Sequence, residues 1–404
     1  MTFTLIVFVV VYLGMMMGSL PGLRVDRAAI ALLGAIALLA SGEVGQSAAL
    51  ASVDFGTIGL LFGLMIVSAN FNLSGLYSAL ADRVRTLSMG PEAFLALVIG
   101  VVGIMSAFLT NDVIAVALAP VLLQVCAVRR LNPVPFLLAL AFSANAGSIA
   151  TIIGSPQNML IGERFDLSFT SFMGYTTVPA LVSLLVIWGI LALQYRGDWS
   201  GPDHLEGEEE GKVPLDTWEA SKGAIVTLVV VGIFLFTGWS RSLVALAAGG
   251  LLLANAHFRS RAMLDRVDWQ LLILFIGLFI VNGALQATHL PAEWIAQLHQ
   301  HGVDLQSPAW IFAATVVLSD IVSNVPSVML LLPFASEAAS APVMAVASGL
   351  SSNLIVIGSL ASIIVVDAAA RRGLTISARQ FMRSGVPVTL ASLALSAVWL
   401  WLIA

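Results

Sequence analysis

The stretch SAFLTNDVIAVALAP, residues 106–120, places three consecutive polar residues inside an apolar block that runs from Phe94 to Val128. Thr110, Asn111 and Asp112 form this interruption, and the last of them carries a carboxyl group. An acid inside an apolar membrane segment is energetically costly and is usually retained for a function. The block therefore predicts a membrane helix that is broken at a polar point.

The rest of the chain has the composition of a polytopic membrane protein. Of its 404 residues, 59% are hydrophobic and 10% are charged, whereas soluble domains have about 25% charged residues. Apolar runs of about 20 residues recur along the chain, each long enough to cross ~30 Å of hydrocarbon. We therefore expect the lipid bilayer as its surroundings, a small solute as its ligand, and no nucleic acid as a partner.

We predict an all-α protein with ten full spans and two further blocks, 91–128 and 308–335, that are too long for one crossing. The full spans are expected near residues 2–20, 25–41, 55–72, 134–158, 176–195, 222–239, 242–257, 268–286, 341–366 and 384–402. If each long block enters and leaves the membrane on one side, all 18 Lys and Arg residues except Arg164 and Arg241 fall on one face. The positive-inside rule therefore favours two helical hairpins, re-entrant or fully crossing, and a cytoplasmic loop at 196–221.

Two halves of the chain share a pattern. VDFGTIGLLFGLMIV (53–67) and VDWQLLILFIGLFIV (267–281) are identical at seven of fifteen positions. Thr110-Asn111 then matches Ser323-Asn324, and Ile153-Gly154-Ser155 matches Ile357-Gly358-Ser359, in the same order. By the topology above the copies are inverted. We divide the chain into N-terminal scaffold spans (1–52), a first repeat (53–195), a cytoplasmic linker (196–221), linking spans (222–266) and a second repeat (267–404).

Four polar interruptions form two repeat-related pairs. The hairpin tips are LTND (109–112) and SNVPS (323–327), and two spans are broken by GSPQN (154–158) and GSLAS (358–362). Ser155 suits a helix cap and Pro156 the first helical position, so a short helix should restart there. Asn324 should cap the second arm of its hairpin. Helix starts bind anions through free N–H groups, and the free carbonyls of the preceding arms suit Na⁺.

These interruptions give the candidate binding residues. They are Thr110, Asn111, Asp112, Gly154, Ser155, Asn158, Ser323, Asn324, Gly358 and Ser359, with Na⁺ expected near Asn111, Asp112 and Asn324. The alternative is that the small polar residues only pack and cap helices, as Asn145 and Asn70 are expected to do through interhelical hydrogen bonds. Four breaks in paired positions favour the binding interpretation.

Asp112 is the candidate with the strongest indication of a function, because it is an acid inside an apolar segment. It is either a proton or cation site, or a helix cap in contact with water. Its repeat counterpart is Val325, so the acid belongs to one copy only. Asp320 is expected to face the same cavity. Because no Arg or Lys falls in the four breaks, an anion would depend on helix starts and on a co-bound cation. No cofactor is expected besides the coupling ion, Na⁺ or H⁺.

The motifs LTNDVIAVALAP, IIGSPQNMLIG, SNVPSVMLLLP and IGSLASIIVVD resemble the ion transporter superfamily. It includes arsenite permeases, NhaD-type Na⁺/H⁺ antiporters, citrate transporters and dicarboxylate symporters, and the chain looks most like the bacterial anion permeases. The resemblance implies a homodimer, an elevator-like transport part, and Na⁺ and substrate at two re-entrant tips. Dicarboxylate symporters carry Ser-Asn-Thr at both tips, and the Thr is missing twice here, which disfavours a dicarboxylate.

The sequence therefore predicts a secondary active transporter of a prokaryotic inner membrane and not an enzyme. It would move a small anion, coupled to Na⁺ or H⁺, by alternating access. The alternatives are a Na⁺/H⁺ antiporter, an arsenite or antimonite efflux permease, and a passive channel. Flux against a gradient would separate a transporter from a channel.

Overall fold

The computed structural model describes residues 2–18, 25–85, 89–201, 213–288, 290–335 and 340–403, without the side chains of Ala81, Val84 and Arg85. Over these ranges the chain is helical, with one isolated β-bridge between Leu131 and Ser200. The charged centre of the predicted cytoplasmic linker, residues 202–212, lies outside the described residues.

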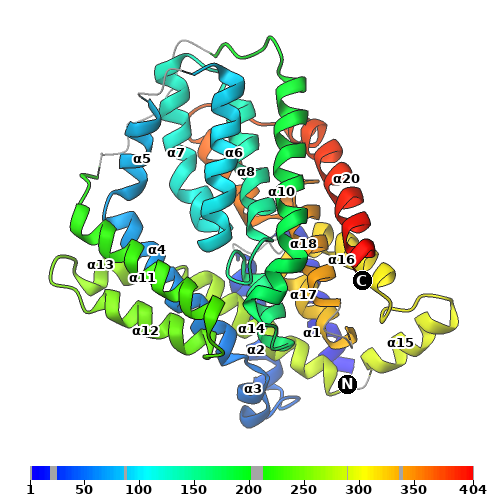
Figure 1. The fold of residues 1–404 in the computed structure, drawn as a ribbon. Helices are drawn as coiled ribbons and strands as arrows, with labels where there is room; N and C mark the ends of the chain where they lie inside the picture. The colour runs from blue at the N-terminus through cyan, green and yellow to red at the C-terminus, as the bar shows by residue number, and fades with distance from the viewer. Residues whose placement is uncertain are drawn as a thin grey trace.

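The helices differ widely in length, from 5 residues in α13 to 26 in α10 and α20 (Figure 1). The first half forms α1 (Thr2–Met17), α2 (Arg27–Ala40), α3 (Gln46–Ser52), α4 (Phe55–Leu73), α5 (Leu76–Arg85), α6 (Pro91–Phe108), α7 (Asn111–Arg129), α8 (Pro133–Ser148), α9 (Pro156–Arg164) and α10 (Phe169–Gln194). The second half forms α11 (Thr217–Phe236), α12 (Arg241–Leu253), α13 (Ser260–Leu264), α14 (Trp269–Gln286), α15 (Leu290–Gln300), α16 (Pro308–Val322), α17 (Asn324–Leu331), α18 (Ser340–Ser351), α19 (Leu360–Ala370) and α20 (Ala378–Ile403), with 3₁₀ turns at Leu332–Phe334 and Val356–Gly358.

Seven of the described helices are long and apolar enough to cross a membrane, namely α4, α6, α7, α10, α11, α14 and α20. The molecule is thus an all-helical, polytopic membrane protein. Helices α1, α2 and α12 are apolar but shorter, with 16, 14 and 13 residues. The number of full spans, ten, stays a prediction for that reason.

All four predicted interruptions break the helices. Helix α6 ends at Phe108 and α7 begins at Asn111, and α16 ends one residue before Ser323. Figure 1 shows α6 and α7 side by side, with their connection directed into the middle of the molecule. Residues 149–155 separate α8 from α9, and residues 352–359 separate α18 from α19. Polar backbone is therefore concentrated in the interior, where protein rather than lipid surrounds it.

Two close helix contacts cross between the halves of the chain. Helix α12 packs along α4, and α2 packs along α14. A Cβ atom on Gly63 of α4 would collide with the backbone of Ala245, and one on Gly277 of α14 would collide with the backbone of Ala31. Small residues allow membrane helices to approach this closely. Each half of the chain is thus packed against a helix of the other half.

We expect Gly63→Val and Gly277→Val to destabilise the protein by about 1–3 kcal/mol each, the usual cost of overpacking a tight contact. Gly232→Val in α11 is a matched control, because no atom of the described residues lies within 4 Å of its Cβ position. Thermal unfolding of the purified protein in detergent measures the effect. Equal melting temperatures for Gly63→Val and the Gly232→Val control would show that the contact is not tight.

Candidate functional site

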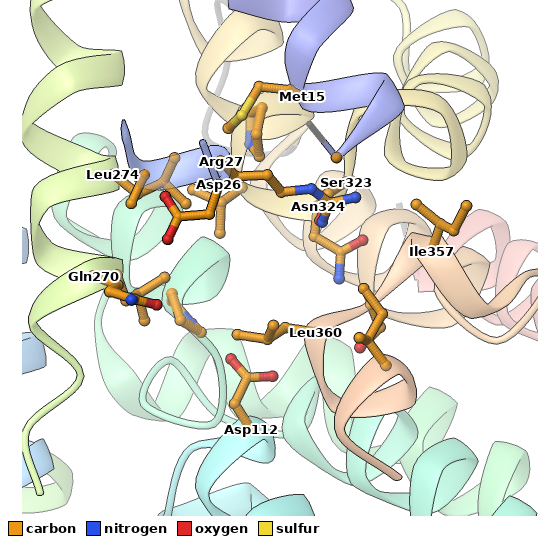
Figure 2. Close-up of a pocket in the computed structure, with 18 of the residues that line it drawn as sticks. Met15, Asp26, Arg27, Asp112, Gln270, Leu274, Ser323, Asn324, Ile357 and Leu360 are labelled. Carbon is orange, nitrogen blue, oxygen red and sulfur yellow. The ribbon is translucent and has the colours of Figure 1, made fainter. Parts of the chain in front are cut away.

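Segments far apart in the sequence line one cavity of about 540 Å³ (Figure 2). Both tips and both breaks contribute to its wall. The lining includes Asn111 and Asp112 from the first tip, Pro156 and Gln157 from the start of α9, Ser323, Asn324, Val325 and Pro326 from the second tip, and Ser359 and Leu360 from the start of α19. The structure thus brings the predicted interruptions together.

Half of the predicted site residues line the cavity and half do not. Those in the lining are Asn111, Asp112, Ser323, Asn324 and Ser359. Those outside the lining are Thr110, Gly154, Ser155, Asn158 and Gly358, of which all but Gly358 lie in the first tip or the first break. Of the second group, Gly154 and Gly358 accept hydrogen bonds from Asn111 and Asn324 of the first group.

The first tip is held by the break of its own repeat. The backbone N–H of Asn111 donates to the Gly154 carbonyl at 3.1 Å. Thr110 caps α7 by position only, because its side chain makes no capping hydrogen bond. Glycine is required at 154, since a Cβ there would collide with the carbonyl of Ser148. Asn158 donates to that same carbonyl and to the carbonyl of Thr151, both at 3.0 Å.

The second tip has a matching arrangement. Asn324 accepts from the Ser352 hydroxyl and donates to the carbonyls of Gly358 at 3.2 Å and Ser348 at 3.1 Å, with its amide orientation assigned from these partners. The prediction that Asn324 caps the arm was wrong by one residue. Ser323 is the capping position, with φ +77° and ψ 161°, a region that is essentially restricted to glycine. The tip therefore stores backbone strain, as functional sites often do.

Asn145 joins the two repeats through a buried amide network. Its side-chain oxygen accepts from Asn111 Nδ2 at 3.1 Å and from the Ser359 hydroxyl at 2.9 Å. Its side-chain nitrogen donates to Asn353 Oδ1 at 2.9 Å. The prediction of an interhelical hydrogen bond for Asn145 is confirmed. The first tip and the second break thus share one hydrogen-bonded amide.

Several buried oxygens near these elements make no hydrogen bond with any described residue. In the first repeat they are Asn111 Oδ1, Ser155 Oγ and Asn158 Oδ1. In the second they are Ser319 Oγ, Asp320 Oδ1, Ser327 Oγ and Ser362 Oγ. Buried polar groups without partners require an explanation, such as a bound ion or water. Oxygen donors of this kind suit hard cations.

Asp112 reaches the cavity from the first turn of α7 and points across it (Figure 2). Its half-buried carboxyl group lies within hydrogen-bonding reach of the backbone of Ala361, at the start of α19. The acid thus contacts a helix start and faces the cavity, and its role as a proton or cation site stays a prediction. Asp268, the cap of α14, lines the same cavity. Asp320 does not line it, and its carboxyl lies 3.1 Å from the position of a Cβ on Gly358.

Sequence reasoning missed Arg27. This residue begins α2 and lines the cavity, and Figure 2 shows its side chain extending toward Ser323 and Asn324. It makes no ion pair with a residue in the described part of the chain. Arg27 lies in the first turn of a predicted span. Charged residues at that position normally lie at the membrane interface, so nothing in the sequence was a reason to place Arg27 in a binding site.

Comparisons with known proteins agree with this architecture. The family model described as citrate transporter (CitMHS) matches residues 4–346. An uncharacterized transporter of Mycobacterium tuberculosis is 29% identical, over 94% of both chains. The silicon efflux transporter LSI3 of Oryza sativa subsp. japonica is 27% identical over 87% of both chains. The crystal structure of the YdaH transporter of Alcanivorax borkumensis has a similar fold, with a TM-score of 0.54, 14% identity, and coverage of 98% of this chain and 96% of that one.

The family match spans most of the chain, and relatives across nearly its full length are named as transporters. The chain therefore belongs to the citrate transporter family, whose members are membrane transporters and not enzymes.

Proposed function

We propose that the protein is a secondary active transporter that moves a small anion together with a coupling cation, Na⁺ or H⁺. The observation that carries this proposal is the mixed charge of the cavity. Arg27, which has no ion pair among the described residues, and the start of α9 line it. Three carboxylates line it as well, those of Asp26, Asp112 and Asp268. A binding site for one charged species alone would not need both kinds of group.

The anion is expected to bind between Arg27 and the start of α9. Pro156 and Gln157 occupy the first two positions of that helix and line the cavity. The N–H groups of a first helical turn have no partner within the helix, and the helix dipole favours negative charge there. Arginine adds donors in a planar arrangement that matches carboxylates and other oxyanions. The family's description as citrate transporters supports an anion as substrate.

The coupling cation is expected near Asp112. Asp268 faces the same cavity, and two ionised carboxylates that share a site repel each other unless a cation or proton is shared. The side-chain oxygens of Asn111 and Ser155, which have no hydrogen-bond partner among the described residues, are additional candidate ligands. Thus Asp112 would carry the proton or help to bind Na⁺, and Asn111 and Asn324 would shape the site.

The transport cycle we propose is alternating access of an elevator type in a homodimer of the prokaryotic inner membrane. It uses two inverted repeats, ten full spans and two re-entrant hairpins, with the linker 196–221 in the cytoplasm. The paired Gly63–Ala245 and Gly277–Ala31 contacts support the repeats. Binding at broken helices between inverted repeats is typical of secondary transporters.

A second candidate function is efflux of a neutral, hydroxylated solute in exchange for a cation. It is favoured by the rice relative, which is named as a silicon efflux transporter. It also agrees with a cavity that the described residues line with the carboxylates of Asp26, Asp112 and Asp268 and with one guanidinium, that of Arg27.

Reconstituted proteoliposomes test these proposals. We expect citrate or another small anion to accumulate above its equilibrium level only when a Na⁺ or pH gradient is imposed. The variants Asn111→Ala and Asn324→Ala are expected to be inactive. Accumulation of silicic acid or arsenite, with no response to anions, would favour the second candidate. A pH-sensitive dye inside the vesicles that responds to Na⁺ alone would indicate Na⁺/H⁺ antiport, and flux that never exceeds equilibrium would indicate a channel.

A further inference from the structure

Arg241, at the start of α12, fastens that helix to the end of α9. Its Nε donates to Glu163 Oε1 at 2.9 Å, and one terminal nitrogen donates to the Gly162 carbonyl at 3.0 Å. The other terminal nitrogen donates to the carbonyl of Leu167. Both charged side chains are largely shielded, with 12% of Arg241 and 20% of Glu163 exposed. The arginine thus ties a helix that packs on α4 to the shorter part of a broken span.

Arg241 and Arg27 occupy equivalent positions in the two halves. Arg241 lies 214 positions after Arg27, the same spacing that separates the matched segments 53–67 and 267–281. Helices α2 and α12 are identical at five of their first thirteen positions. The same spacing relates Gly63 to Gly277 and Ala31 to Ala245, the residues of the two close helix contacts. These matches extend each repeat beyond the predicted 53–195 and 267–404, to include the helices that carry the arginines.

The two arginines are in different states in this structure. Arg241 is bound to Glu163, whereas Arg27 extends into the open cavity without an ion pair in the described residues. The repeat counterpart of Glu163 is Asp367 in α19, at the spacing of 204 that relates the two breaks. Asp367 is exposed, and among the described residues it pairs with Arg371 at the end of the same helix, at 2.8 Å. The second repeat therefore has, at the end of its own broken span, a carboxylate equivalent to the one that Arg241 binds.

We propose that Arg27 and Arg241 alternate during transport, each facing the cavity when its side is open and binding a carboxylate of the broken span when its side is closed. In the opposite state, Arg27 would bind Asp367 and Arg241 would be released to the other mouth. The arginine at the open mouth would position the incoming anion, which makes both arginines positioning residues for transport. This proposal rests on the proposed function.

The alternation of the two arginine ion pairs has a physical advantage. A buried ion pair on one side alone would favour one conformation, and a ligand would have to supply the energy to leave it. If one arginine cluster forms as the other breaks, both states keep one ion pair and their populations remain comparable. The anion then interacts with a guanidinium in either state, whichever side it enters from.

Thiol accessibility tests this alternation without any substrate. Cys126 is the only cysteine and is buried, so Cys126→Ala gives a background for single probes. Leu274 lines the cavity, and its repeat counterpart Leu60 is fully buried. In this structure a maleimide should therefore label Leu274→Cys quickly and Leu60→Cys slowly. Labelling after denaturation in detergent confirms that both probes are reactive.

We expect Arg241→Gln and Glu163→Gln to raise the labelling rate of Leu60→Cys about fivefold and to lower that of Leu274→Cys, the effect of losing one partly shielded ion pair. Arg27→Gln and Asp367→Asn should change both rates in the opposite direction. Arg164→Gln is the matched control, because Arg164 is the exposed neighbour of Glu163 and should change neither rate.

Two results would overturn the alternation: labelling changes of the same sign in Arg27→Gln and Arg241→Gln, or no change in either variant. The proposed function fails separately. If the variants shift labelling in opposite directions but wild-type vesicles accumulate no anion, the alternation of the two arginines is supported and the proposed anion substrate is wrong. If wild-type vesicles accumulate an anion and labelling does not respond, transport stands and the alternation is excluded.

Discussion

Replacing Asp112 with asparagine is expected to reduce cation-driven uptake by at least about tenfold, equivalent to ~1.4 kcal/mol or more of coupling. An amide has nearly the same shape as a carboxyl group and still offers an oxygen to the backbone of Ala361. The local structure should therefore be preserved. What is lost is a negative charge that releases a proton or binds Na⁺, and with it the link between the cation gradient and the solute.

The measurement is initial uptake into proteoliposomes under an imposed Na⁺ or pH gradient, repeated over a range of external pH. Solute exchange at equal concentrations on both sides, with no gradient, should be affected much less than driven uptake. Glu92→Gln is a suitable control, because Glu92 is an exposed acid at the far end of the same helix pair. If Asp112→Asn keeps gradient-driven uptake and its pH dependence, Asp112 is only a structural contact to α19.

Replacing Asn145 with alanine is expected to have the largest effect on stability. The substitution leaves Asn111 Nδ2, the Ser359 hydroxyl and Asn353 Oδ1 without their shared partner. Each buried polar group that loses its hydrogen bond costs about 1–3 kcal/mol. The two repeats would also lose a direct connection beside the cavity. Transport should fall along with the melting temperature.

Thermal unfolding in detergent and uptake in proteoliposomes measure the two effects. Ser143→Ala is the matched control, since Ser143 is buried on the same helix and its hydroxyl donates to the Ala139 carbonyl of that helix. Ser143→Ala should lower the melting temperature only slightly, because its hydrogen bond lies within one helix and connects no neighbouring helix. Wild-type stability in Asn145→Ala would mean that the surrounding groups find other partners and that the amide is not a structural centre.

The helix breaks could be predicted from local chemistry. Ser155 and Pro156 favour a helix start in any surroundings, and α9 begins at Pro156. The second tip was misplaced by one residue because Ser323 adopts a conformation that its residue type disfavours. Such strain is imposed by tertiary packing and has no signal in the local sequence.

The composition of the cavity could be predicted only in part. Asn111, Asp112 and Asn324 were found because they are polar residues in apolar blocks. Arg27 and Asp268 were missed because they stand at helix starts, where charged residues are common and need no special explanation. The packing of α2 on α14 places both of them beside the same cavity. The hydrogen-bond partners of Asn145 could likewise not be predicted, because they depend on which helices become neighbours in the fold.

The packing of α12 on α4 and of α2 on α14, across the two halves of the chain, has a consequence for biosynthesis. As the chain emerges from the ribosome, α4 enters the membrane long before α12, against which its Gly63 packs. Until α12 is made, the glycine face of α4 has only lipid or a chaperone beside it. The N-terminal half therefore cannot complete its fold while it is being translated. A truncated transcript that ends in the linker should yield a product that quality-control proteases remove quickly, and co-expression of the missing half should protect it.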